Sequence, residues 1–422
     1  MSASGNLMEY VNRMKPVLKK LIPAPALRMA KQSVLKKITA QIEQVQTEPY
    51  DPAAYPYGVN LIGPLDSATG LGQSFRLLER VVGQCGVPYL IYNYAQNTRN
   101  KIQITDYESR VADSLDYSVN IWHVNPSDFA EMYACMGKES FDRRYNIAYW
   151  LWELEEFPDE WVPYIRLLDE IWTPSEFISE SIRRKTDKPV RTAPYCVTAQ
   201  GDTKRYDRQY FGLPEDKFLF LMMYDTQSIQ ERKNPEGILQ AYRQAFSPSD
   251  TDVGLVIKVN SASDQDLELL RDKMKGYPNL YFIRRNLERI EVNSLIADAD
   301  VFVSLHRAEG FGLVLAEAML NHVPTVATDW SANTEFMNRD VACMVSCRMK
   351  TLEKDYFPYR KGNRWADPDI SEAADYMKRL ANDQEYYHQI ETAAYTHIRS
   401  KLGMDGVRPI VEKRLREIRD DK

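Results

Sequence analysis

The sequence predicts an α/β protein that contains two domains, each built on a parallel sheet with helices on its faces. Short apolar runs typical of buried strands alternate with helical patterns over residues 49–200, and the same alternation returns over residues 201–400. A polar, irregular stretch from Tyr195 to Lys217 separates the two series, and we interpret it as a hinge. A chain of 422 residues is long enough for two or three separate cores.

Composition narrows the class of protein. A hydrophobic content of 44% and a charged content of 27% are typical of globular domains. The sequence contains no run of about 18 apolar residues that would cross a bilayer, and no secretory signal is expected. The formal net charge of -6 argues against general binding to nucleic acid. The five scattered cysteines favour free thiols in a reducing compartment over disulfides or zinc.

The first 48 residues form a basic extension ahead of the strands. Residues 1–42 hold eight Lys and Arg against Glu9 alone, a net charge of +7. Apolar residues recur at helical spacing in two segments, from Leu7 to Ile22 and from Leu27 to Val45. Two interpretations are open: the helices lie on an anionic lipid surface, or they dock on a partner subunit or on the body of this protein.

A glycine-bearing turn opens the first series of strands and helices. A strand over residues 57–63 leads into a loop that contains Gly70 and Gly72, and a helix is predicted from Phe75. This order is typical of a turn that faces phosphate, although a plain strand-to-helix turn has the same pattern. NAD is not expected, because Phe75 stands where the dinucleotide fingerprint has its third glycine.

Two further stretches of the first series carry candidate side chains. His123 follows a predicted strand over residues 117–122, and open α/β sheets bind ligands at the carboxyl ends of their strands. A structural histidine is the alternative. Trp152 and Glu153 lie in an aromatic, acidic stretch over residues 145–161. The ring could stack on an acceptor sugar while the carboxylate binds its hydroxyls, or the rings could be core and the acids helix caps.

The second series begins with a pair of cations. A predicted strand over residues 218–223 is followed by a loop that holds Arg232 and Lys233, just before a helix. Two adjacent cations at a strand-to-helix loop could neutralise a diphosphate. The two D-x-D strings, which begin at Asp298 and Asp367, precede a buried strand and lie in a turn, so no metal site is expected.

A later stretch of the second series combines a short buried strand over residues 301–305, a polar loop over 306–312 and a helix over 313–321. This arrangement points free backbone N–H groups of the helix start at an anion. Gly310 and Gly312 allow the backbone to approach a ligand closely, because they have no Cβ atom.

Two carboxylates flank this loop. Glu309 lies in the loop and Glu317 lies on the helix, with seven residues between them. The backbone amides suit a diphosphate, and the carboxylates can accept hydrogen bonds from the hydroxyls of a sugar or a ribose. The stretch therefore predicts a site for a sugar joined to a diphosphate.

These motifs resemble those of retaining glycosyltransferases of family 4, of the bacterial surface-polysaccharide type. The resemblance rests on Glu309 and Glu317 around Gly-Phe-Gly, within SLHRAEGFGLVLAEAM, and extends from about Gly58 onward. It implies the GT-B fold, in which two Rossmann-like domains face each other across a cleft. The first would bind the acceptor and the second the nucleotide sugar, and residues 401–422 would form a helix that returns to the first domain. Such enzymes generally need no metal or cofactor.

The resemblance also implies a role for each candidate residue. Lys233 would bind the donor phosphates, Glu317 the ribose hydroxyls and Glu309 the donor sugar. Many members have an arginine where this chain has Gln227, and we expect Arg232 to substitute for it. His123 would lie against the donor sugar, and the catalytic residues would be His123, Glu309 and Lys233. The other donor-binding residues would be Gly70, Gly72, Arg232, Gly310, Phe311, Gly312, Leu313 and Glu317.

The implied reaction transfers a sugar with retention from a nucleotide-diphosphate sugar to a saccharide or lipid-linked saccharide acceptor. The resemblance and the basic extension predict a cytoplasmic enzyme, peripheral on the inner membrane, that extends an O-antigen or capsule. Two other classes remain open: a nucleotide-sugar epimerase of the same fold, and a non-catalytic subunit that binds the donor.

Overall fold

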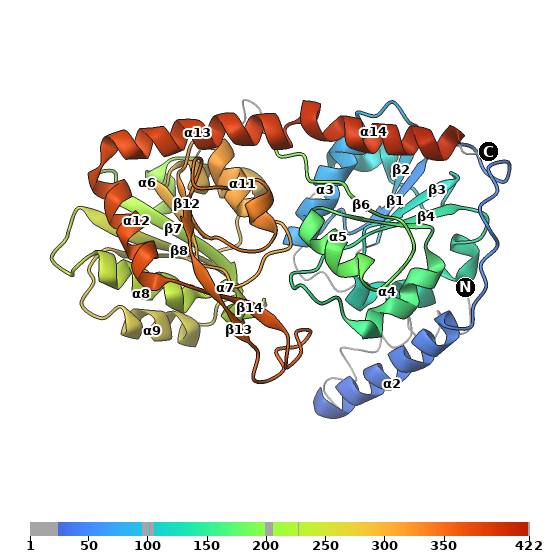
Figure 1. Cartoon of the computed structure of the whole chain (residues 1–422), viewed down its shortest axis with the longest axis horizontal. Coiled ribbons are helices and arrows are strands. Elements are labelled where there is room, and N and C mark those ends of the chain that lie inside the picture. Colours follow the sequence, from blue (N-terminus) through green and yellow to red (C-terminus); the bar gives the residue numbers. More distant parts are fainter. Residues whose placement is uncertain (1–23, 95–100, 102–104, 199–205, 227, 421–422) are drawn as a thin grey trace. The chain divides into compact units, whose positions relative to one another are not determined.

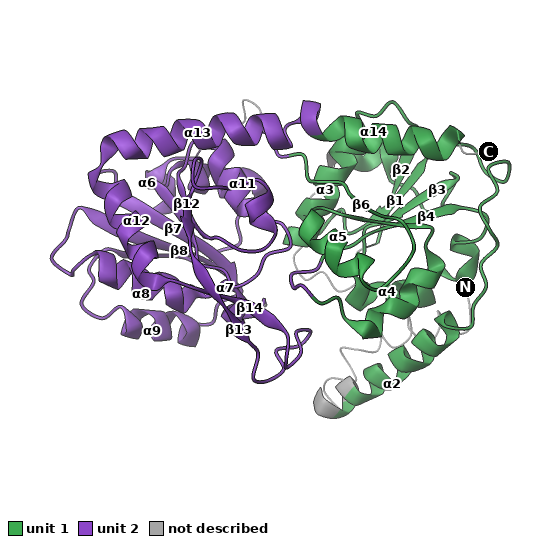
Figure 2. Cartoon of the chain, in the orientation of Figure 1, with its two compact units in different colours: residues 1–151, 156–196, 407–422 green, residues 152–155, 197–406 purple. Residues whose placement is uncertain are grey.

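The computed structural model describes residues 24–94, 101, 105–198, 206–226 and 228–420 (Figure 1). The chain divides into two compact units (Figure 2). Unit 1 comprises Met1–Leu151, Glu156–Cys196 and Val407–Lys422, and unit 2 comprises Trp152–Glu155 and Val197–Gly406. The predicted helix over residues 7–22 and the position of Gln227 lie outside the described residues.

Unit 1 is built on a six-stranded parallel sheet, as the alternating pattern predicts. Its strand order is β2-β1-β3-β4-β5-β6. Apolar residues such as Leu61, Ile121 and Ile147 are fully buried in it. The strands are β1 (Val59–Gly63), β2 (Tyr89–Asn93), β3 (Val119–Trp122), β4 (Tyr145–Tyr149), β5 (Glu170–Thr173) and β6 (Val190–Thr192).

A row of buried asparagines crosses three adjacent strands of unit 1. The Nδ2 atom of Asn60 on β1 donates to Oδ1 of Asn120 on β3 at 2.8 Å, and Nδ2 of Asn120 donates to Oδ1 of Asn146 on β4 at 2.9 Å. Register pairs the same residues, Asn60 with Asn120 and Asn120 with Asn146. A slip of one residue would leave buried amides without partners, so the row favours a single register.

Helix α3 (Gly70–Val82) begins five residues earlier than the sequence pattern predicts. The side chain of Thr69 accepts a hydrogen bond from the backbone N–H of Gly72 at 3.4 Å, which caps the helix before the first apolar residue. Gly70 and Gly72 therefore lie in the first turn of α3 and not in a loop. A Cβ on Gly72 would come within 2.2 Å of the Ser67 carbonyl oxygen, so only glycine fits there.

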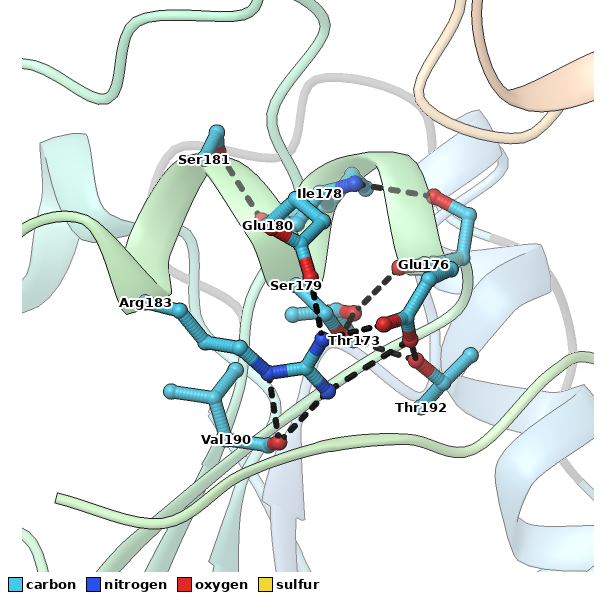
Figure 3. A network of polar contacts seen from close by, with 10 residues as sticks. Thr173, Glu176, Ile178, Ser179, Glu180, Ser181, Arg183, Val190 and Thr192 are labelled. Atoms are coloured by element: carbon cyan, nitrogen blue, oxygen red, sulfur yellow. Dashed lines mark hydrogen bonds and ion pairs between the residues drawn. The ribbon is translucent and has the colours of Figure 1, made fainter.

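Helix α5 (Glu176–Arg183) is tied to strands β5 and β6 by the polar network of Figure 3. The Arg183 guanidinium donates to the carbonyl oxygen of Val190 at 2.9 Å and also contacts Glu176 and Glu180. Thr192 on β6 donates to Glu176 at 2.5 Å. The network holds a short helix that could not be stable alone.

Two terminal helices pack on unit 1. In α2 (Ala24–Ile42), Ile38 and Ile42 are 3% and 0% exposed, and Lys31 forms an ion pair with Glu131 on α4 (Pro126–Met136). This part of the apolar stripe therefore docks on the body of the protein, while binding of the extension to lipid stays a prediction. In α14 (Met404–Asp420), Arg414 donates to the fully buried Glu170 at 2.7 Å.

Unit 2 contains a second six-stranded parallel sheet, in the order β12-β11-β10-β7-β8-β9. One buried cluster joins Leu255, Ile257 and Val259 of β8 (Val253–Asn260) to residues of α8 (Pro235–Ala245) and α12 (Ile370–Asn382). The strands are β7 (Phe218–Asp225), β8 (Val253–Asn260), β9 (Leu280–Ile283), β10 (Val301–Ser304), β11 (Thr325–Thr328) and β12 (Cys343–Val345). The helices of unit 2 include α7 (Gln230–Lys233), α8 (Pro235–Ala245), α10 (Arg289–Ala297), α11 (Leu313–Leu320) and α12 (Ile370–Asn382). An antiparallel hairpin, β13 (Cys347–Thr351) and β14 (Arg364–Pro368), completes the unit.

The cysteines and the apolar character of the helices were both considered in the sequence. All five cysteines fall within the described ranges and are free thiols. Over the same part of the chain, no helix has the length and apolar character needed to traverse a lipid bilayer.

Candidate functional site

The candidate site in unit 2 is organised by the loop between β10 and α11, where the predicted strand, loop and helix are all present. Gly312 is the N-cap residue of α11 and has a φ of 89°, a left-handed conformation that side chains rarely adopt. A Cβ there would come within 3.2 Å of Asn333 and Leu315. Glycine thus allows the sharp turn that aims the first amides of α11 out of the loop.

The cations expected at the diphosphate lie beside this loop. They sit on α7, a single helical turn that ends at Asn234 with a left-handed φ of 52°. The Nδ2 atom of Asn234 donates to the carbonyl of Leu305 at 2.9 Å, and the Arg307 amide donates to the carbonyl of Arg232 at 2.7 Å. These bonds join α7 to the end of β10 and bring Arg232 and Lys233 up to Glu309.

Glu309 is the centre of a compact charge cluster. Lys233 Nζ donates to its Oε1, and Arg232 Nη1 lies 3.3 Å from its Oε2. Arg232 also donates to the carbonyl of Ala308 at 2.8 Å. Burial alone would raise the pKa of Glu309, but the charges of Lys233 and Arg232 outweigh it and lower that pKa to about 2. Glu309 is therefore ionised near neutral pH.

Ser331 holds the backbone of Glu309, and Asn333, which is bonded to His306, holds Ser331; the sequence analysis assigned none of the three. The backbone N–H of Glu309 donates to Ser331 Oγ at 3.0 Å, and Ser331 has an unusual φ of 77°. His306 Nε2 lies 3.0 Å from Asn333 Oδ1, and its Nδ1 lies 3.1 Å from Ser304 Oγ. Asn333 uses its Nδ2 to donate to Thr328, so Nε2 of His306 must carry the proton. Burial lowers the pKa of His306, so its imidazole is neutral, and its role is to hold the side chain of Asn333 in position.

Glu317 lies on α11 and is 5% exposed. Its Oε1 forms an ion pair with Arg289 on α10, a partner that the sequence analysis did not find. Among the described residues, its Oε2 has no hydrogen-bond partner. A buried carboxylate oxygen without a partner is costly, so this atom is suited to accept a hydrogen bond from a ligand hydroxyl.

Other predicted residues occupy different surroundings. Phe311 is 7% exposed, and its ring centroid lies 5.2 Å from that of Phe336, so its side chain belongs to the core under the loop. Trp152 is 2% exposed and packs on Tyr359. Glu153 lies 3.8 Å from Arg232 and belongs to unit 2. The structure thus joins Glu153 to the charge cluster, an association that the sequence analysis did not predict.

In unit 1, His123 is fully buried just after β3. Its Nε2 lies 2.7 Å from Ser74 Oγ, and its ring stacks on Tyr149 with a centroid separation of 4.9 Å. Within the described ranges, its Nδ1 has no partner. Ser74 Oγ in turn donates to Tyr195 Oη at 2.6 Å, which fixes the hydroxyl group that the imidazole contacts.

Burial lowers the pKa of His123 from 6.5 to about 3, and this predicts a pH dependence. Below pH 6.5 this histidine binds a proton in the unfolded chain but stays neutral in the folded protein. The free energy of unfolding therefore falls as pH decreases from 6.5 towards 3. The expected loss is about 1.4 kcal/mol per pH unit. Urea unfolding at pH 7 and pH 5 should show a smaller difference in His123→Phe than in the wild type. His388→Asn, which alters a surface histidine, is the control; a His123 variant with the wild-type difference would contradict the assignment.

Residues 203–397 match the family model for glycosyl transferases group 1. This part of the chain is similar to group 1 glycosyltransferases. It contains the whole Arg232, Lys233, Glu309 and Glu317 arrangement. No curated protein matches the sequence.

Solved structures resemble the chain beyond residues 203–397. Sucrose-phosphate synthase from Thermosynechococcus elongatus has a TM-score of 0.62 and 13% identity, over 87% of this chain and 100% of that one. Anabaena HepE, in complex with UDP and glucose, has a TM-score of 0.57 and 12% identity, over 86% and 100%. S. aureus TarM, in complex with UDP and α-GlcNAc-glycerol, has a TM-score of 0.52 and 14% identity, over 78% and 61%. The likenesses show the fold, which is of the GT-B type.

Proposed function

We propose that this protein is a retaining glycosyltransferase that moves a sugar from a nucleotide-diphosphate sugar to a saccharide or lipid-linked saccharide acceptor. The charge cluster of Arg232, Lys233 and Glu309, set beside the amides at the start of α11, is the observation that carries the proposal. A glycosyl donor leaves behind a diphosphate, and cations and helix amides are the groups that stabilise it.

The proposed roles follow from the chemistry of each group. Lys233 and Arg232 neutralise the leaving diphosphate. Glu309 accepts hydrogen bonds from the donor sugar, and Oε2 of Glu317 accepts one from the ribose. In unit 1, Nδ1 of His123 would accept a hydrogen bond from a sugar hydroxyl. Retention and independence from metal are proposed on the family resemblance.

The identity of the substrates is proposed from the neighbours and the resemblance. HepE binds UDP and UDP-glucose, and TarM was solved with UDP and a glycosylated glycerol. UDP-sugars are therefore the first donors to test. The acceptor is proposed to be a growing surface polysaccharide of the O-antigen or capsule type.

The test begins with thermal shift of the wild-type protein against a panel of UDP-, GDP- and dTDP-sugars. The donor that raises the unfolding temperature is then incubated with and without saccharide acceptors. We expect transfer with an acceptor and only slow hydrolysis without one. Conversion of the donor alone into an isomer would instead indicate an epimerase, and tight binding without any turnover would indicate a non-catalytic subunit.

A further inference from the structure

The segment Trp152–Glu155 is part of unit 2, although the chain on both sides of it belongs to unit 1 (Figure 2). The hairpin of β13 and β14 holds it there. The ring of Trp152 packs on that of Tyr359 with a centroid distance of 5.4 Å, and Arg364 Nη2 donates to Glu155 Oε2 at 3.0 Å. Trp152 and Tyr359 are 2% and 3% exposed, so packing of the two rings holds the segment against the hairpin.

This packing places the carboxylate of Glu153 between two groups. Tyr359 Oη donates to its Oε2 at 3.0 Å. Its Oε1 lies 3.8 Å from Arg232 Nη2. Arg232 is 6% exposed and has its Nη1 directed to Ala308 and Glu309. One side of the buried guanidinium thus faces Glu309 and the other faces Glu153.

The described contacts of this cluster join two cations, Arg232 and Lys233, to two carboxylates, Glu153 and Glu309. The formal charges of these four groups cancel, so the cluster as a whole offers little net attraction to a diphosphate. An incoming diphosphate must therefore displace one carboxylate from its cation. Glu309 is bonded to Lys233 and lies 3.3 Å from Arg232, whereas Glu153 lies 3.8 Å away, beyond ordinary hydrogen-bond length. Glu153 is the partner that can be displaced.

We propose that Glu153 is a positioning residue that occupies Arg232 while the site is empty and yields it to the diphosphate. Tyr359 keeps the carboxylate in reach, so that Glu153 returns to Arg232 when the diphosphate departs. Competition of this kind weakens diphosphate binding and speeds release of the nucleotide product, a step that limits many enzymes. The inference rests on the proposed function, because it assigns the diphosphate to the same cluster.

Glu153→Gln tests the proposal, because it keeps the shape of the side chain and removes its charge. The probes are inorganic pyrophosphate and UDP, measured by calorimetry on the full chain. We expect both to bind at least about fivefold more tightly to the variant, because one competing charge near 4 Å changes an affinity by about that factor even in water, and by more beside a buried guanidinium. In transfer assays, KM for the donor and kcat should fall together.

Glu155→Gln is the matched control. It removes a carboxylate of the same segment that pairs with Arg364 instead, and it should leave the affinity for both probes unchanged. Tyr359→Phe supplies a second test, because Tyr359 acts through Glu153. Any effect of Tyr359→Phe on pyrophosphate affinity should vanish in the Glu153→Gln background, a non-additivity that general loss of packing would not produce.

Two results would overturn the inference in different ways. If the wild type binds the probes and Lys233→Ala loses them, but Glu153→Gln binds within twofold of the wild type or more weakly, the role of Glu153 is wrong and the proposed function stands. If the wild type binds neither the probes nor any nucleotide sugar, the proposed function fails and this inference fails with it.

Discussion

Lys233→Ala should lower the rate of sugar transfer by about 100- to 1000-fold. Lys233 is the cation bonded directly to Glu309, and its ammonium is placed to neutralise the charge that develops on the departing diphosphate. Loss of one such charged donor costs on the order of 3 kcal/mol of transition-state stabilisation. Initial rates with a saturating acceptor would measure kcat and kcat/KM, and both should fall because the interaction is strongest in the transition state.

The controls for this prediction must separate catalysis from folding. Thermal unfolding of the variant without ligand shows whether the fold is intact. Glu309→Gln should also lower turnover at least tenfold, and the double variant should lose less than the two effects combined, because the residues form one ion pair. A Lys233→Ala variant that transfers sugar at a near-normal rate would contradict the assignment of the diphosphate to this cluster.

Glu317→Ala should weaken binding of the nucleoside diphosphate by about 10- to 100-fold. The substitution removes the buried Oε2, which has no hydrogen-bond partner within the described ranges, and a bond to a charged acceptor contributes about 1.5–3 kcal/mol. It also leaves Arg289 without its partner, so some loss of stability is expected. Calorimetric titration with UDP and GDP measures the effect.

A conservative variant distinguishes the charge from the shape at this position. Glu317→Gln retains an oxygen acceptor, so its affinity should lie between those of the wild type and Glu317→Ala. Glu385→Ala, which removes an exposed carboxylate of the same unit, should change nothing. Unchanged nucleotide affinity in both Glu317 variants would contradict the assignment of ribose binding to Glu317.

Much of unit 2 was predictable because its signals are local in sequence. The strand at residues 301–305, the turn at Gly312 and the helix that carries Glu317 follow from apolar runs, a required left-handed φ and helix propensity, all within 20 residues. The start of α3 was misplaced because its signal is a single capping side chain, Thr69, and not the apolar periodicity that begins at Phe75.

The partners of the site residues were beyond such reasoning. Glu317 meets Arg289, 28 residues away, and Glu309 rests on Ser331. Glu153 reaches Arg232 from the segment between β4 and β5. No local pattern marks these pairs, since each depends on which loops the parallel sheet gathers at one edge.

The sequence by itself determined that the chain forms two β/α series, and that one of them ends a strand in a glycine turn between two glutamates. Those features depend on interactions between near neighbours. Only the tertiary structure decided how the charges are matched: that Arg232 is shared by Glu309 and Glu153, and that one oxygen of Glu317 is buried without a partner in the described chain. Charge pairing and burial are properties of distances in space, which packing of remote segments sets.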